Sequence, residues 1–194
     1  MRVLVLYAHP VEASFCAALR TRAVEALERA GHEVDLCDLY AEGFEAAMSR
    51  EERIVYEDEA ENRKSVNQHV DRLTAAEALV LVFPVWNFGF PAILKGYLDR
   101  VFLPGVSFSL RQGGTRPHLT GLRRIVGIAT YGAPWWVAFF LRDPPRRMVR
   151  RVLRAIAAPR AATEYYALYG MDEADDAKRQ AFLDDVDAAM ARLR

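Results

Sequence analysis

The sequence predicts a single doubly wound α/β domain, in which a five-stranded parallel sheet carries helices on both faces. Apolar runs of strand length alternate with longer stretches whose apolar residues recur at helical spacing. This alternation is typical of a parallel sheet with right-handed crossover connections. The chain has 194 residues, which is enough for one sizeable core. We therefore expect one domain over residues 1–194, with the strand order 2-1-3-4-5.

The first elements follow from local patterns. Residues 2–8 are apolar after Arg2 and predict a buried strand. Residues 14–30 have helical periodicity, with Ser14 suited to cap the helix and Gly31 suited to end it. Residues 33–39 alternate between apolar and polar side chains and predict a second strand, nearer the sheet edge.

The middle of the chain begins with an acidic surface segment at residues 49–61, and a helix is expected over residues 61–76. Residues 78–82 form an apolar run that predicts a buried central strand, broken at Pro84. Pro91 is suited to the first position of the next helix, residues 91–102.

The segment of residues 103–121 contains four glycines and two prolines, so we expect a long functional loop. The remaining expected elements are a strand at residues 124–130, a helix at 146–157, a strand at 162–168 and a helix at 177–193.

Composition excludes several classes of protein. The formal net charge is zero, which gives no overall attraction to nucleic acid or to an anionic membrane. Residues 78–94 are uncharged but contain two prolines, so we expect no membrane span.

Cys16 and Cys37 form no pair with metal-ligand spacing, so we expect no metal site. With so few cysteines, we expect a reducing cytoplasm. We recognise no signal peptide. The dinucleotide and P-loop motifs are absent, which disfavours a dehydrogenase of the Rossmann type and a P-loop NTPase.

Three segments carry a family resemblance. Residues 83–102 read Phe-Pro-Val-Trp-Asn-Phe-Gly-Phe-Pro-Ala-Ile-Leu-Lys-Gly-Tyr-Leu-Asp-Arg-Val-Phe. Residues 3–10 with 14–16, and residues 129–133, also match in order. Together they resemble the flavodoxin-like NAD(P)H:quinone oxidoreductases. The resemblance implies bound FAD or FMN, NAD(P)H as co-substrate and a quinone-like acceptor. It also implies which residues contact the flavin, at the sheet edge where open α/β sheets bind ligands.

In this resemblance, one loop meets the ribityl or phosphate part of the flavin, a second lies beside its ring, and a third gives backbone N–H groups to the ring edge where negative charge collects on reduction. The first loop corresponds to His9, Ser14, Phe15 and Cys16, the second to Pro84, Val85, Trp86, Asn87 and Phe88, and the third to Thr130, Tyr131, Gly132 and Ala133. Each assignment has a purely structural alternative. His9 can face solvent, Phe15 can belong to the helix core, the aromatic rings of the second loop can cap the core, and the third loop can be a turn that closes a strand.

The chain departs from the family after the third loop. Relatives of the DT-diaphorase type carry a Tyr and a His there that assist proton movement, but no His lies between Tyr131 and Arg142. The catalytic residues we expect are therefore Tyr131 and Gly132, acting through preorganised backbone donors. The proton can come from solvent, from His118 or from Tyr131.

Residues 134–141 include Trp135, Trp136, Phe139 and Phe140, a stretch too apolar for one small domain to bury, so we expect a homodimer. An arginine cluster follows, which suits a solvated face, the 2′-phosphate of NADPH or an acidic partner. Its members are Arg142, Arg146, Arg147, Arg150, Arg151, Arg154 and Arg160.

Two other functions stay open. The first is an ancillary subunit of a membrane transporter, which the arginines would serve. The second is a flavodoxin-type electron carrier, which the neutral charge disfavours.

Overall fold

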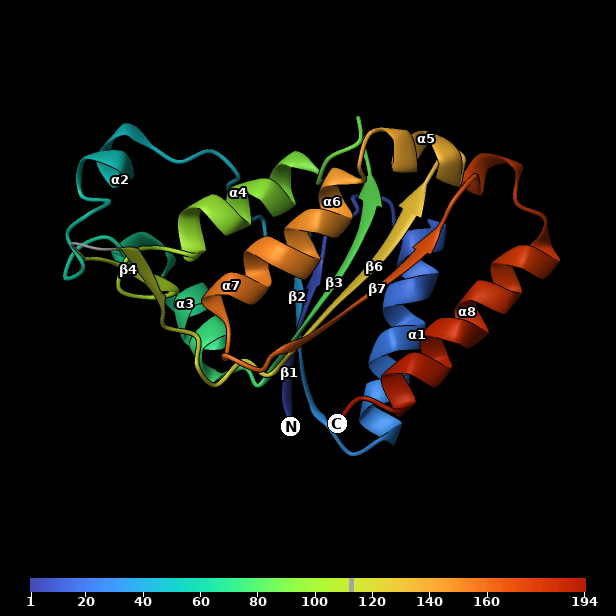
Figure 1. The fold of residues 1–194 in the computed structure, drawn as a ribbon, viewed down its shortest axis with the longest axis horizontal. Coiled ribbons are helices and arrows are strands. Elements are labelled where there is room, and N and C mark those ends of the chain that lie inside the picture. The colour runs from blue at the N-terminus through green and yellow to red at the C-terminus, as the bar shows by residue number, and fades with distance from the viewer. Residues whose placement is uncertain (112–113) are drawn as a thin grey trace.

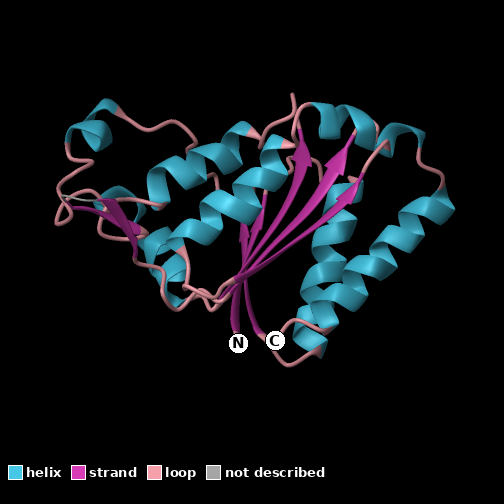
Figure 2. Ribbon diagram, viewed as in Figure 1, coloured by secondary structure: helices cyan, strands magenta, loops and turns pink. Residues whose placement is uncertain are grey.

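A computed structural model describes residues 1–111 and 114–194, without the side chains of residues 110–115. Five parallel strands form one sheet in the order β2-β1-β3-β6-β7 (Figures 1 and 2), which confirms the predicted topology. The strands are β1 (Arg2–Tyr7), β2 (Glu33–Asp38), β3 (Ala78–Val85), β6 (Arg124–Tyr131) and β7 (Ala162–Leu168). The last of these has the predicted bounds, and β2 is an edge strand as expected.

Helices cover both faces of the sheet (Figures 1 and 2). Helices α1 (Phe15–Arg29) and α8 (Asp176–Ala191) lie on one face. The other face carries α3 (Asn67–Ala75), α4 (Ala92–Val101) and a helix built from α6 (Pro144–Arg147), a π-helical stretch η2 (Met148–Leu153) and α7 (Arg154–Ile156). Ser14 caps α1 through its side chain and Gly31 follows with a positive φ of 80°, as the sequence predicts.

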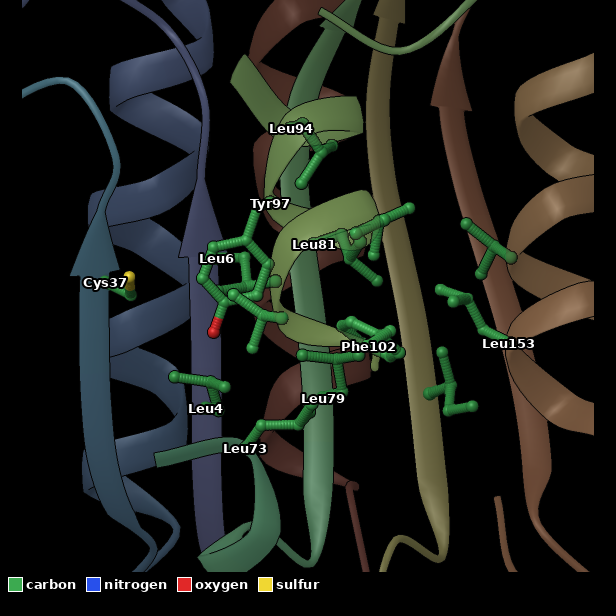
Figure 3. Close-up of a cluster of buried hydrophobic side chains, with 14 of the residues drawn as sticks. Leu4, Leu6, Cys37, Leu73, Leu79, Leu81, Leu94, Tyr97, Phe102 and Leu153 are labelled. Atoms are coloured by element: carbon green, nitrogen blue, oxygen red, sulfur yellow. The ribbon is translucent and has the colours of Figure 1, made fainter. Parts of the chain in front are cut away.

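Alternate residues of each strand supply two cores. Val3, Val5 and Tyr7 face α1 and α8, whereas Leu4 and Leu6 face the other layer. Figure 3 shows this second core, where leucines of β1 and β3 meet Tyr97, Leu94 and Phe102. With a core on each face, the sheet is a rigid base for the loops at its ends.

Strand β3 does not break at Pro84, contrary to the sequence prediction. Pro84 pairs with Thr130 of β6, and the strand runs on to Val85. The partner on the other side, β1, ends its pairing at Tyr7 opposite Val82. The missing N–H of Pro84 therefore lies where β3 has only one neighbour, and a proline is tolerated at such a local edge.

Several other expectations need correction. The long loop expected at residues 103–121 contains a separate antiparallel hairpin that was not predicted, in which β4 (Phe108–Arg111) pairs with β5 (Gly114–Pro117). Pro91 is the N-cap of α4 rather than its first residue. The helix expected from residue 61 starts as the 3-10 turn η1 (Lys64–Val66), and the helix expected from residue 146 begins at Pro144. Three short helices were not predicted: α2 (Arg50–Ile54), α5 (Trp135–Phe140) and η3 (Met171–Glu173).

Across the residues that the structure describes, no helix is both long and apolar enough to cross a membrane.

The acidic segment is anchored to the core through Glu52. Its carboxylate pairs with Arg100 at 2.5 Å, with both side chains at least 85% shielded. Burial alone would raise the pKa of Glu52, but hydrogen bonds from Arg100, Ser65 and the Ser49 N–H outweigh it and hold the pKa at about 2 instead of 4.5.

This shift predicts a pH dependence of stability. Because the folded pKa is depressed, the contribution is fully present above pH 4.5 and is lost as the pH falls toward about 2. We expect it to be at most about 3 kcal/mol. Urea unfolding of wild type and Glu52→Gln at several pH values measures it. If the free energy of unfolding changes equally with pH in the two proteins between pH 5 and pH 2, the lowered pKa does not belong to Glu52.

Candidate functional site

The carboxyl ends of β1, β3, β6 and β7 meet at one edge of the sheet, at the top of Figure 1. The loops that leave these ends contain most of the site residues expected from the sequence. Open parallel sheets bind ligands at this edge.

The first loop leads from β1 into α1. His9 accepts a hydrogen bond from the Val11 N–H at its Nδ1 (3.0 Å), and its ring lies 5.9 Å from that of Trp86. His9 is therefore held between two loops of the edge and is not simply a solvent-facing histidine.

The start of α1 offers backbone donors of the kind that bind anions. Ser14 Oγ accepts from the Ala17 N–H at 3.1 Å, whereas the N–H groups of Phe15 and Cys16 have no partner among the described residues. Such donors and the positive end of a 15-residue helix favour a phosphate.

Two side chains of this loop are turned toward the core. The Cys16 thiol is buried, and burial raises its pKa to about 12. Phe15 packs against the core beneath α1 and α8. Any phosphate contact of Cys16 and Phe15 would therefore come from their N–H groups, because the thiol is buried and the ring of Phe15 packs partly against the core.

The second loop is a tight turn at the end of β3. The Gly89 N–H donates to the Trp86 carbonyl at 2.9 Å, and the Trp86 N–H donates back to Gly89 at 3.3 Å. Asn87 (φ 50°) and Phe88 (φ 55°) lie between them in the left-handed region. Two consecutive non-glycine residues in this region store strain, which proteins concentrate at functional sites.

The turn presents Trp86, which is 43% exposed, to the edge of the sheet, whereas Pro84 is buried in the strand and Val85 packs partly against the core. Trp86, Asn87 and Phe88 thus lie in the turn at this edge of the sheet. The ring of Pro84 does not face the edge, because β3 continues through this residue.

The third loop follows β6. Gly132 is exposed, and the N–H groups of Gly132 and Ala133 have no partner within the described parts of the chain. The Ala133 carbonyl accepts from the Gly170 N–H at 2.9 Å, which fixes the loop to the end of β7. Thr130 is buried and belongs to the strand. The available donors are therefore backbone groups, as expected.

The side chain of Tyr131 points inward. Its hydroxyl donates to Asp143 Oδ1 at 2.5 Å and lies 2.7 Å from the Tyr165 hydroxyl, and the residue is 1% exposed. Burial raises the pKa of the Tyr131 phenol far above its usual range. Tyr131 is therefore unsuited to donate a proton to a ligand at this edge, and only its backbone remains a candidate.

Asp143 organises a network that the sequence analysis did not identify. Its Oδ2 accepts from Tyr169 at 2.7 Å. Burial, then this hydrogen bond, raises the pKa of Tyr169 to about 12. Asp143 also caps α6 with a φ of 42°. An Asp immediately before Pro144 is a signal for a helix N-cap, although its tyrosine partners could not be inferred.

Helix α5 presents an apolar surface beside this network. Trp135, Trp136, Phe139 and Phe140 are 60–81% exposed. A hollow of about 700 Å³ lies between these rings and the arginines of the next helix. Its lining comprises Trp135, Phe139, Phe140, Arg142, Asp143, Arg146, Arg147, Arg151 and Tyr169. Among the described residues, none of these four arginines forms an ion pair.

His118 lies elsewhere. Its Nδ1 is 3.2 Å from the Gly105 carbonyl, and the adjacent Leu119 bridges to Ala157 at the amino-terminal edge of the sheet. Within one chain, His118 is thus at the wrong edge to serve this site.

Comparison with known proteins agrees with the fold. Residues 1–190 match the family model described as the flavodoxin-like fold. The chain is 32% identical over 148 residues to NAD(P)H dehydrogenase [quinone] 1 of Cavia porcellus, and the match covers 68% of this chain and 54% of that protein. The match thus spans about half the length of this curated relative.

Two solved structures are similar over the whole chain. A protein of Streptococcus mutans UA159 has a TM-score of 0.87 at 27% identity, with all of both chains covered. An NAD(P)H:quinone oxidoreductase from Methanothermobacter marburgensis has a TM-score of 0.84 at 23% identity, with 100% of this chain and 99% of the other covered.

Proposed function

The chain belongs to the family of proteins with the flavodoxin-like fold, and we propose that it is a flavin-dependent NAD(P)H oxidoreductase that reduces quinone-like acceptors. The observation that carries the proposal is the convergence of three loops at one sheet edge. They offer backbone donors that have no partner in the described part of the chain, at Phe15, Cys16, Gly132 and Ala133, beside the exposed ring of Trp86. The name of the guinea-pig relative supports the reaction class.

These residues suit FMN or FAD. The N-terminus of α1, with Ser14, would hold a phosphate. Trp86 and the strained turn beside it would lie against the ring, and the N–H groups of Gly132 and Ala133 would meet an electron-rich ring edge. When bound, the flavin supplies hydride and two-electron transfer.

We propose that NAD(P)H and the acceptor use this edge in turn. The chain positions each of them against the same ring-binding loops, so its contribution is orientation and exclusion of water. Tyr131 and Tyr169 both donate to Asp143, so the proton taken up by the acceptor comes from solvent. Both cysteines are buried free thiols, which suits a reducing cytoplasm.

The test is the cofactor itself. Purified protein should be yellow, with flavin absorption bands and one FMN or FAD per chain by mass analysis. It should reduce its flavin with NADH or NADPH, and continued oxidation of the nucleotide should require an acceptor such as a quinone. Colourless protein that binds neither FMN nor FAD on incubation would refute the proposal.

We further propose that the protein is a homodimer. An exposed apolar surface lies at the edge of the sheet where the carboxyl ends of the strands meet, which we call the ligand edge. It consists of Trp135, Trp136, Phe139 and Phe140, and a second copy of the chain would cover it. Light scattering should give twice the chain mass at micromolar concentration. Replacing Phe139 and Phe140 with serine should shift the measured mass toward that of a monomer. A wild-type monomer that still holds its flavin would contradict this.

We propose a preference for NADPH over NADH, because these arginines have no ion-pair partner among the residues the structure describes. Arg147 and Arg151 line the hollow beside the edge and could pair with the 2′-phosphate. A lost charge-assisted hydrogen bond is worth about 1.5–3 kcal/mol. Arg147→Gln with Arg151→Gln should therefore raise the KM for NADPH about tenfold or more. The KM for NADH should stay within about twofold of wild type.

Arg160→Gln is the matched control, since Arg160 lines a different hollow at the amino-terminal edge. Equal changes in the KM values for NADPH and NADH would show that Arg147 and Arg151 do not bind the 2′-phosphate.

A further inference from the structure

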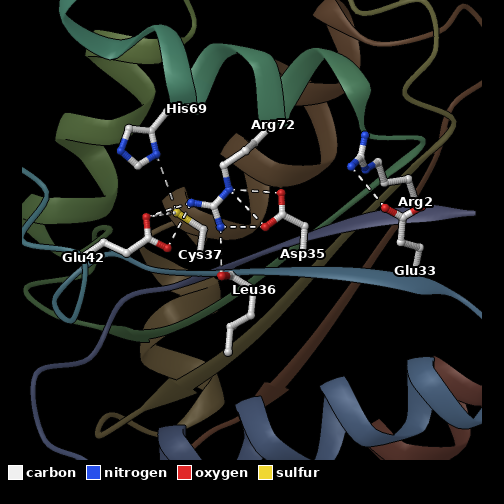
Figure 4. A network of polar contacts seen from close by, with 8 residues as sticks. All are labelled: Arg2, Glu33, Asp35, Leu36, Cys37, Glu42, His69 and Arg72. Carbon is white, nitrogen blue, oxygen red and sulfur yellow. Dashed lines mark hydrogen bonds and ion pairs between the residues drawn. The ribbon is translucent and has the colours of Figure 1, made fainter.

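Three potential metal ligands converge outside the ligand edge, between strand β2 and helix α3. Cys37 lies on β2, Glu42 in the loop that follows, and His69 on α3 (Figure 4). Cys37 Sγ is 3.6 Å from Glu42 Oε2 and 3.8 Å from His69 Nδ1, and all three atoms lie within 4.8 Å of one another.

Their chemistry and spacing fit zinc. Thiolate, imidazole and carboxylate are its ordinary ligands, with bonds of about 2.3 Å to sulfur and about 2.0–2.1 Å to nitrogen or oxygen. At tetrahedral angles these bonds place a sulfur about 3.5 Å from a nitrogen or oxygen ligand. The observed separations of 3.6 Å and 3.8 Å are close to that value. Three protein ligands leave a fourth position for water.

The neighbouring charges also balance. Arg72 forms ion pairs with both Asp35 and Glu42 at 2.7 Å (Figure 4). With Cys37 deprotonated, the two carboxylates and the thiolate carry three negative charges, and Arg72 with a divalent ion carries three positive ones. Arg72 can keep Asp35 and the Leu36 carbonyl as partners while Glu42 shares its carboxylate with the metal.

A buried polar group lies near this cluster. The hydroxyl of Tyr97 has no hydrogen-bond partner among the described residues, and its ring is 5.5 Å from the His69 ring. Orphaned buried hydroxyls are unfavourable. A metal-bound water would be a partner for this hydroxyl if it reached the site.

We propose that Cys37, Glu42 and His69 bind one zinc-like divalent ion, which ties the edge strand β2 to helix α3. A metal binds cysteine as the thiolate, so binding must displace the thiol proton of Cys37, which passes to solvent.

Cobalt(II) titration of the purified, flavin-loaded chain tests this site. A tetrahedral thiolate site gives intense cobalt d–d bands in the red, beyond the flavin absorption, and zinc should abolish them. We expect one equivalent bound, with about one proton released per ion in weakly buffered solution. The readout does not depend on reductase activity or on the identity of the flavin.

Variants assign the ligands. Cys37→Ser and His69→Asn should each weaken binding more than about 100-fold, since even second-shell changes cost about 10–100-fold. Cys16→Ser is the matched control, because Cys16 is the other buried free thiol and lies near the opposite core. It should leave the metal affinity unchanged. Thermal unfolding without metal verifies that each variant is folded.

Two results would overturn the inference. One is the absence of the tetrahedral cobalt spectrum at millimolar metal. The other is equal weakening by Cys16→Ser and Cys37→Ser.

Discussion

Replacing Gly132 with valine should lower the rate of quinone reduction by about 100-fold, the expected loss when one preorganised donor is displaced. The N–H groups of Gly132 and Ala133 are the donors that the third loop offers at the ligand edge. A Cβ on residue 132 would lie 2.7 Å from Asp172 Oδ2. The branched side chain of valine must therefore displace either Asp172 or the loop.

A graded series separates these two outcomes. Gly132→Ala should lose little, because its nearest neighbour is the end of the exposed Asp172 side chain, which can turn away. Adding Asp172→Ala to Gly132→Val should restore part of the rate if the contact with Asp172 displaces the loop. Steady-state rates at saturating NADPH and quinone, normalised to bound flavin, measure the series.

Gly121→Val is the matched control, since nothing lies within 4 Å of the Cβ position at Gly121. His118→Ala should reduce the rate by less than about tenfold, because a positioned general acid contributes ~10²–10⁴-fold and His118 sits at the amino-terminal edge. Full activity of Gly132→Val together with an inactive His118→Ala would refute the backbone-donor mechanism.

The sequence was sufficient where a local pattern determines the structure. Ser14 caps α1 and Gly31 follows it because both signals act within one turn of helix. The position of Trp86 at the ligand edge follows from the end of an apolar run, since the carboxyl ends of parallel strands share one edge.

Contacts between distant residues could not be predicted. Asp143 accepts from Tyr131 and Tyr169, which are 12 and 26 residues away. The cluster of Cys37, Glu42 and His69 likewise depends on how α3 packs beside β2, and the expectation of no metal site rested on sequence spacing alone. The strand through Pro84 was missed because a proline is acceptable only where the neighbouring strand has ended, which is a tertiary condition.

The largest effect on stability is expected at Asp143. Its carboxylate is buried and accepts from the hydroxyls of Tyr131 and Tyr169, and its backbone adopts a φ of 42°. Asp143→Ala leaves both buried phenols without their acceptor and places alanine in a region that aspartate and asparagine tolerate better. Leaving a buried donor without its acceptor costs about 1–3 kcal/mol per group, so for two phenols we expect a loss of about 2–6 kcal/mol by urea unfolding.

Smaller changes show whether the charge or the hydrogen bonds matter. Asp143→Asn keeps an acceptor and tolerates the left-handed backbone, so it should lose less than half as much as alanine. Tyr169→Phe should lose about 0.5–1.5 kcal/mol, the usual net value of one hydrogen bond, or up to about 3 kcal/mol if the charge strengthens it. In the background of Asp143→Ala, the same Tyr169→Phe change should become nearly neutral, because the hydroxyl has already lost its partner. Additive losses for this pair would mean that Asp143 does not hold Tyr169, and the end of β7 would then need another anchor.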